Sequence, residues 1–198
     1  MADDLPADLQ ALDDELTAAA RDAEALTAGL PEALGARRPD EGGWSVAECL
    51  DHLATANRVY LAAMQAPAER ARARGRRRRG PARPGWAGRL FIATLEPPAR
   101  LWLKRRAPRI IRPRGAPALA DAFASFMASQ ADVRAFLRAH ADLDLARLRF
   151  PNPFVRGIRF SLATGLHVIT AHDRRHLWQA WRVRRAVEGR RASMPGRA

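Results

Sequence analysis

Four stretches of the chain carry apolar residues at the three- and four-residue spacing of an amphipathic helix. In the first, residues 5–30, the apolar positions form one continuous stripe: Leu5, Leu9, Leu12, Leu16, Ala19, Ala23, Leu26 and Leu30. The second helix is predicted to begin at Ser45, because Ser45 and Glu48 have the spacing of a capping box, and its stripe continues to Met64. The other two predicted helices cover residues 119–140 and 161–188.

The segment between the second and third helices, residues 67–117, is rich in Pro, Gly and Arg and is predicted to be a long connection. Short helical pieces are expected within it at Trp86–Leu95 and Ala99–Arg106. No window alternates apolar and polar residues with β-branched enrichment, so no sheet is predicted. The predicted fold is an all-α four-helix bundle in one domain, residues 1–198, with a basic crossover and a frayed tail at 189–198.

Composition changes this picture mainly through the distribution of charge. The 198 residues are 47% hydrophobic, which suits a folded domain, and carry a formal net charge of +13. Residues 67–114 hold sixteen basic and two acidic side chains, whereas residues 1–51 hold three basic and thirteen acidic ones. Lys104 is the single lysine, and the arginine bias, with abundant Ala and Pro, is typical of a GC-rich coding sequence. The positive charge therefore belongs to one segment and not to the whole fold.

The cysteine count and the hydropathy bear on the cellular compartment. A single cysteine, Cys49, permits no internal disulfide. The first residues, MADDLPADLQ, lack the basic and apolar regions of a signal peptide, and no run of about 20 apolar residues predicts a spanning helix. We therefore expect a cytoplasmic protein.

The histidines of the last predicted helix are the strongest candidates for chemistry. His172 and His176 lie about 40° apart around the helix axis, on the arc of its apolar residues, whereas His167 is predicted to face solvent on the opposite side. Two neutral imidazoles at this spacing can bind one metal ion with a third ligand from elsewhere. His52, beside the apolar stripe of the second helix, is a better candidate than His140 at the end of the third. The alternative is a set of hydrogen-bonded core histidines, and spacing alone does not decide.

The segments GGWSVAECLDHLATAN and AHDRRHLWQAWRVR resemble the two signature ends of the DinB-like superfamily. The matching positions are Trp44, Ser45, Glu48, His52, Leu53, His172, Arg175, His176 and Gln179. The resemblance spans most of the chain and implies a four-helix bundle of the DinB/YfiT-like type, a group with metal-dependent hydrolases and bacterial low-molecular-weight-thiol transferases. It also implies one metal ion on three histidines, one from the second helix and two from the last. By that pattern His52, His172 and His176 form the predicted triad.

Three histidine ligands leave coordination positions open, which is typical of a reactive metal site. One divalent ion, with zinc or nickel expected, could activate water for hydrolysis of a small-molecule substrate. It could equally hold a low-molecular-weight thiol as the thiolate for S-transfer. Gln179 is a candidate for orienting a ligand, and Asp173 for orienting an imidazole or pairing with a neighbouring arginine. Trp44 and Cys49 are candidates for the pocket wall, although core packing is the stronger explanation for both.

Functions of other classes stay open. One is a bundle that binds a metal or ligand without catalysis. Another uses residues 67–114, whose arginines and apolar side chains suit an anionic membrane surface or nucleic acid, although no helix-turn-helix or RNA-recognition motif accompanies them. A solvated crossover is the simpler interpretation of that segment. Trp178 and Trp181 are predicted to point away from the histidines and to cover the crossover or the second subunit of a homodimer.

Overall fold

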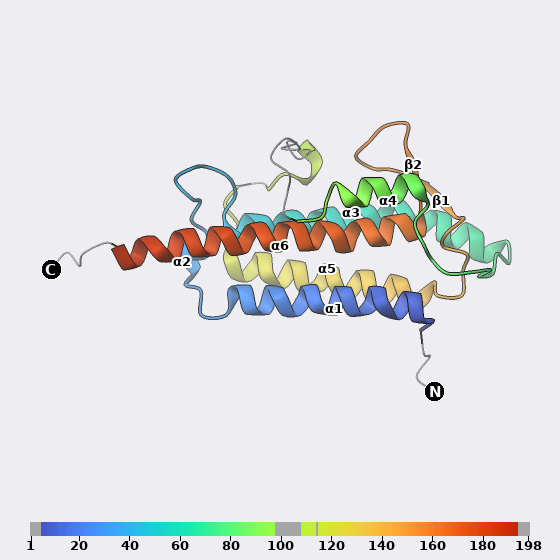
Figure 1. The fold of residues 1–198 in the computed structure, drawn as a ribbon, viewed down its shortest axis with the longest axis horizontal. Coiled ribbons are helices and arrows are strands. Elements are labelled where there is room, and N and C mark those ends of the chain that lie inside the picture. Colours follow the sequence, from blue (N-terminus) through green and yellow to red (C-terminus); the bar gives the residue numbers. More distant parts are fainter. Residues whose placement is uncertain (1–4, 98–107, 114, 194–198) are drawn as a thin grey trace.

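The structure, a computed structural model, describes residues 5–97, 108–113 and 115–193, the side chains of residues 190–193 excepted. Its four long helices are α1 (Ala7–Thr27), α3 (Val46–Ala73), α5 (Leu119–Ala139) and α6 (Leu162–Ser193). In Figure 1, α1 and α6 run in one direction while α3 and α5 run in the other. Both α3 and α1 pack against α5 and α6, so every long helix has two long neighbours. The predicted all-α four-helix bundle is confirmed.

Apolar side chains fill the bundle in two clusters along its length. Members of the first are Leu12, Met64, Leu137 and Leu166, and members of the second are Leu26, Leu50, Phe126 and Leu177. Between them, α3, α5 and α6 bury a layer of polar side chains: Asn57, Ser129, Gln130 and Asp173. Because buried polar groups need hydrogen-bond partners, this layer fixes how the three helices align.

The start of α3 has the capping box that the sequence predicts. The Ser45 hydroxyl accepts a hydrogen bond from the Glu48 backbone N–H at 3.1 Å, and the Glu48 carboxylate accepts one from the Ser45 N–H at 2.9 Å. Arg38 forms an ion pair with Glu48 from outside. These bonds hold the residues before α3, including Trp44, against the end of the bundle.

The C-terminal half of α3 differs from the prediction. The helix continues through Pro67 to Ala73, so the connection begins later than residue 67. Ala68 and Ala71 are buried in the first apolar cluster. Their packing outweighs the backbone hydrogen bond that proline removes, which is how tertiary contacts override a local helix breaker.

The described part of the crossover contains the short helix α4 (Trp86–Ala93) and the 3-10 helix η2 (Arg109–Ile111). The helix predicted at Trp86–Leu95 is thus confirmed, whereas the one predicted at Ala99–Arg106 lies outside the described residues. Packing of α4 on α6 is close, because a Cβ at Gly88 would lie 2.7 Å from the Thr164 hydroxyl oxygen.

A small hairpin precedes α6, and the prediction that the chain has no sheet is wrong in this place. Strands β1 (Arg149–Pro151) and β2 (Arg159–Ser161) pair antiparallel, with Phe150 opposite Phe160. Both rings are buried in the first apolar cluster. Strands of three residues are too short to show an alternating pattern in the sequence, and their tertiary contacts specify them.

The remaining helix ends also differ from the predicted ones. The first helix is shorter than the predicted range, residues 5–30, because α1 begins at Ala7 and ends at Thr27. A short helix, α2 (Glu32–Gly35), follows it. At the other end, α6 stays helical to Ser193, so residues 189–193 of the predicted frayed tail belong to the helix, and residues 194–198 lie outside the described residues. None of the described helices is long and apolar enough to cross a membrane.

Candidate metal centre

Three histidines from two helices meet in the bundle, His52 buried and His172 and His176 half-buried. His52 comes from α3, His172 and His176 come from α6, and one ring nitrogen of each lies within 4.8 Å of the others. The ring centroids are 5.0 Å apart for His52 and His172, 4.5 Å for His52 and His176, and 4.6 Å for His172 and His176. The structure therefore brings together the three histidines that the sequence analysis grouped.

Each ring takes its place from local helix geometry. His172 and His176 are one turn apart on α6 and so project from the same face. His52 lies in the second turn of α3, next to buried Leu53, and is 1% exposed. Because α3 and α6 pack against each other, these two faces meet and the three imidazoles converge.

A backbone group of the crossover fixes the orientation of His52. Its Nδ1 lies 2.6 Å from the carbonyl oxygen of Ile111 in η2. A carbonyl only accepts, so Nδ1 carries the proton and donates it, which leaves Nε2 with its lone pair. That Nε2 lies 3.2 Å from Nε2 of His172. Sequence analysis missed the role of Ile111, since a backbone carbonyl has no residue signature.

The separation of these nitrogens suits a shared ion. Two imidazole nitrogens bound to one tetrahedral zinc ion at about 2.0–2.1 Å lie about 3.3–3.4 Å apart. The 3.2 Å between the Nε2 atoms of His52 and His172 is close to that spacing. On His176, Nδ1 is buried without a hydrogen-bond partner. A buried nitrogen with no partner is costly unless something binds it, so the three rings fit a divalent metal ion.

The electrostatic surroundings keep the three rings neutral. Burial, together with His52 and Arg175, lowers the pKa of His172 to about 3. Burial also holds the pKa of His176 well below its usual value, and the Gln179 side chain opposes this shift. For His52, burial lowers the pKa and the bond to Ile111 opposes it. Neutral imidazole is the form that binds a metal, so no proton competes for these lone pairs at pH 7.

One wall of the cluster is aromatic. The Trp44 ring centroid lies 4.6 Å from that of His52 and 5.8 Å from that of His176, on which it stacks. Of the two residues predicted for the pocket wall, Trp44 thus contacts the cluster. Cys49 instead lies fully buried among apolar side chains of the second cluster, and burial raises the pKa of its thiol well above the usual range.

A cation lies beside the histidines. Arg175 donates a hydrogen bond to the Thr94 carbonyl at 2.9 Å, and within the described chain it forms no ion pair with a carboxylate. Its neighbour Arg174, in contrast, forms ion pairs with Glu15 and Glu96. The positive charge of Arg175 lowers the pKa of His172 and His176 and leaves the surroundings of the cluster attractive to an anion.

Asp173 points into the polar layer and not toward an arginine. Its carboxylate accepts hydrogen bonds from the Gln130 amide at 2.8 Å and the Asn57 amide at 3.4 Å. Burial raises its pKa to about 7, against the effect of those two bonds. The expected pairing with a neighbouring arginine is therefore replaced by contacts with α3 and α5, which fix the α6 backbone next to His172. Asn57 and Gln130, which interrupt the apolar faces of α3 and α5, are the sequence signals for this layer.

The other two histidines lie outside the cluster. His140, at the end of α5, has Nδ1 2.8 Å from the Phe136 carbonyl and is buried. His167 lies near Glu15 and the backbone of Ala82 and is half-buried. It is therefore less exposed to solvent than predicted. Trp181 donates a hydrogen bond to Asp22 of α1 at 2.8 Å and packs there.

The protein is a helical bundle in which three histidines from two helices converge on one candidate metal site. The family model of the DinB superfamily matches residues 15–180 of the chain. This chain belongs to the DinB superfamily. Comparison with curated proteins and with solved structures gives no significant match.

Proposed function

We propose that the chain is a metal-dependent enzyme that binds one divalent ion on His52, His172 and His176. Convergence of three neutral imidazoles, one of them with a buried nitrogen that lacks a partner, is the observation that carries the proposal. Membership of the DinB superfamily supports it. Because three protein ligands converge among the described residues, coordination positions stay open there, as in catalytic rather than structural zinc sites.

The proposed reaction is activation of a small nucleophile for attack on an electrophilic small molecule. The bound ion would lower the pKa of a thiol or a water molecule, and zinc or nickel suits imidazole ligands. Of the two nucleophiles we favour a low-molecular-weight thiol, because the sequence resembles a superfamily that includes thiol transferases; hydrolysis by activated water is the alternative. A cytoplasmic setting is part of this proposal, because thiols stay reduced there.

The residues around the histidines have separate tasks in this proposal. The Ile111 carbonyl keeps the proton of His52 on Nδ1. Trp44 covers the imidazoles and excludes water from one side. Arg175 attracts an anionic group of the thiol or of the substrate, since its charge is not neutralised by a carboxylate of the described chain.

A turnover assay tests the proposal. The assay compares three proteins: wild type loaded with zinc or nickel, the metal-free protein, and His52→Ala. Each is tested for S-transfer with a panel of thiols and alkylating electrophiles, and for hydrolysis with a panel of esters. We expect turnover only with metal, and a loss of about 100-fold or more in His52→Ala. His167→Gln removes a histidine outside the cluster and should retain activity. Turnover that survives removal of the metal would contradict the proposal, and bound metal without turnover would favour a non-catalytic metal-binding bundle.

A further inference from the structure

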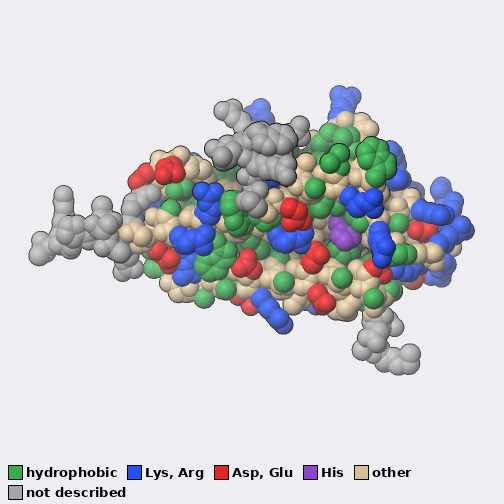
Figure 2. Space-filling model, viewed as in Figure 1, with side chains coloured by type: hydrophobic (Ala, Val, Ile, Leu, Met, Phe, Trp, Pro, Cys, Tyr) green, Lys and Arg blue, Asp and Glu red, His purple; other side chains and the backbone are tan. Residues whose placement is uncertain are grey.

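A concave site lies at the end of the bundle away from the histidines. It is a hollow of about 530 Å³ lined by nine arginines from three parts of the chain: the end of α3, residues 74–79 and the β1–β2 hairpin region. Figure 2 shows arginine side chains gathered at the end of the molecule where α3 ends. His52 and Arg70 are 18 residues apart on α3, roughly 27 Å along its axis. The arginine hollow is therefore separate from the candidate metal centre.

Most of these cations form no ion pair with a carboxylate of the described residues. Arg77 pairs with Asp142, Arg78 with Asp8, and Arg147 is 3.8 Å from Asp144. The other six form no ion pair with a carboxylate in the part of the chain that the structure describes: Arg70, Arg74, Arg76, Arg79, Arg149 and Arg159. Asp144 is the one acidic residue of the lining. Like charges held this close repel one another and cost stability unless an anion binds among them.

Backbone hydrogen bonds hold the arginines of the α3 end in place. Gly75 has a φ of 63°, its N–H donates to the Arg72 carbonyl at 2.9 Å, and the Arg76 N–H donates to the Ala71 carbonyl at 2.9 Å. This pair of bonds is a Schellman motif, which ends a helix in a defined turn. The Arg78 N–H also donates to the Asp142 carbonyl at 2.8 Å, which ties the turn to the loop after α5.

The hairpin holds the arginines of the opposite side. Phe150 and Phe160 face the core, so the alternate residues Arg149 and Arg159 project outward from the paired strands. Arg159 donates a hydrogen bond to the Arg149 carbonyl at 3.4 Å. Two fixed backbone elements thus place exposed, unpaired arginines of the described chain around one hollow.

We propose that this arginine hollow binds a small soluble anion with several phosphate groups in a row, as in an oligophosphate chain. Guanidinium groups bind phosphate oxygens in pairs of hydrogen bonds, and six uncompensated cations call for more than one phosphate. The volume lies in the range of small-molecule sites and the hollow is concave, which favours a compact ligand over an extended polymer.

Calorimetric titration of inorganic triphosphate and of orthophosphate into the full-length, metal-free protein tests this proposal. Omitting the metal prevents chelation from appearing as binding. We expect one triphosphate per chain, bound at least tenfold more tightly than orthophosphate and more weakly at higher salt. Arg76→Gln/Arg149→Gln should weaken triphosphate at least tenfold. Arg70→Gln/Arg79→Gln, which removes the same charge from other positions of the lining, should do the same if the first variant folds poorly.

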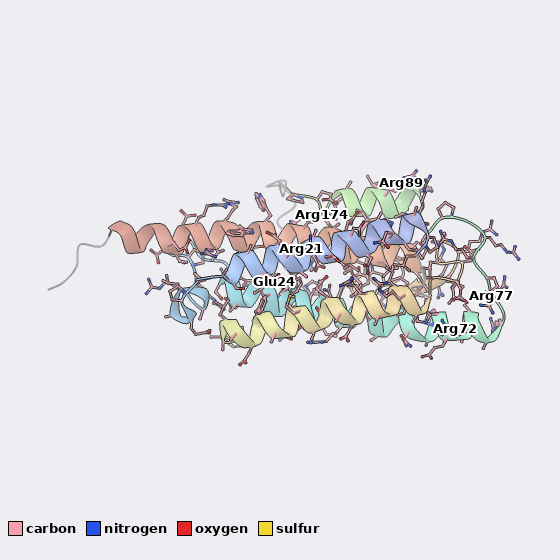
Figure 3. The ribbon with its side chains drawn as sticks, turned by 90° about the horizontal axis from the view of Figure 1, so that it is seen from below. Arg21, Glu24, Arg72, Arg77, Arg89 and Arg174 are labelled. Atoms are coloured by element: carbon pink, nitrogen blue, oxygen red, sulfur yellow. The ribbon has the colours of Figure 1, made fainter. Side chains whose placement is uncertain are left out.

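The matched control is Arg83→Gln/Arg89→Gln, which removes two exposed arginines outside the lining. Figure 3 shows Arg89 on α4, apart from Arg72 and Arg77 at the end of α3. This variant should bind triphosphate within about twofold of wild type. Equal weakening in control and lining variants would show general surface attraction and overturn the proposal. A single-stranded oligonucleotide that binds more tightly than triphosphate at the same salt would also overturn it, in favour of a nucleic-acid surface, and so would absence of triphosphate binding.

Discussion

The hydrogen bond between His52 and the Ile111 carbonyl sets which nitrogen of His52 faces the other two rings. A carbonyl oxygen can only accept, so this contact selects one tautomer regardless of pH near neutrality. Arg175 lies beside the neutral imidazoles, donates a hydrogen bond to the Thr94 carbonyl and forms no ion pair with a carboxylate of the described residues. Together the two residues give a site with free nitrogen lone pairs and a positive charge that no described carboxylate neutralises.

Replacing Arg175 tests the second of these features. We expect Arg175→Gln to lower kcat/KM about tenfold for an anionic thiol or substrate and to change it little for a neutral analogue, because one charge-assisted contact is lost. Metal content should stay the same. Arg182→Gln, an exposed arginine that lies over Trp178 on the same helix, is the control. An equal loss for neutral and anionic substrates would mean that Arg175 acts on the structure and not on the ligand's charge.

At the scale of elements, a buried carboxylate joins α1 to α5. Asp13 accepts hydrogen bonds from Arg134 at 2.9 Å and from Arg138 at 2.8 Å and is 3% exposed. Both arginines are partly exposed, which screens their charges. The hydrogen bond with Arg134 and the two positive charges hold the pKa of Asp13 below its usual value, against the effect of burial.

This shift predicts a pH-dependent contribution to stability. A lowered pKa in the folded state stabilises the protein above the unfolded pKa, and the gain disappears as pH falls through the folded value. Asp13→Asn should therefore lower the free energy of unfolding by about 1–2 kcal/mol at pH 7, and the difference should shrink below about pH 4. Urea unfolding at pH 7 and pH 3 measures it. The control is Asp14→Asn at an exposed position, which should change the free energy of unfolding by no more than about 0.5 kcal/mol. A loss of stability in Asp13→Asn that is the same at pH 7 and pH 3 would contradict the ion-pair account.

Contact of α6 with α3 and the hairpin depends on a glycine. A Cβ at Gly165 would lie 2.6 Å from the Met64 sulfur and 2.9 Å from the Phe150 ring. Gly165→Ala should thus cost about 1–3 kcal/mol through overpacking, measured by urea unfolding. Gly189→Ala, on the same helix with nothing within 4 Å, should be neutral or stabilising by up to about 1 kcal/mol. Equal changes in the free energy of unfolding for the two substitutions would show that helix propensity, and not packing, determines the effect of Gly165→Ala.

The sequence predicts the elements better than it predicts their contacts. Apolar stripes and the capping box at Ser45 predict the long helices, because both signals are local. The extension of α3 past Pro67 and the hairpin at Phe150 depend on tertiary packing, which overrides local preferences. Within the site, the pair His172 and His176 follows from helix geometry alone. The Ile111 contact and the direction of Asp173 do not, because they depend on how separate segments pack.

At the scale of the whole molecule, the histidine cluster connects two helices that are far apart in the sequence. An ion bound to His52 on α3 and to His172 and His176 on α6 would act as a cross-link and stabilise the folded state alone. At a zinc concentration of 100 times its Kd, we expect a gain of about 2.7 kcal/mol, or about 5–10 °C in Tm. His176→Ala should lose most of this shift and His167→Gln should keep it. A shift of equal size in both variants would place zinc binding elsewhere.

Metal analysis with X-ray absorption on purified protein, after loading with zinc or nickel and removal of excess ion, tests the central claim most directly. The account predicts close to one ion per chain, with three imidazole nitrogens at about 2.0–2.1 Å for zinc. His176→Ala should lose the ion and His167→Gln should retain it. A wild type that stays free of metal, or an ion retained undiminished in His176→Ala, would contradict the account, and the three histidines would then be core residues of the bundle.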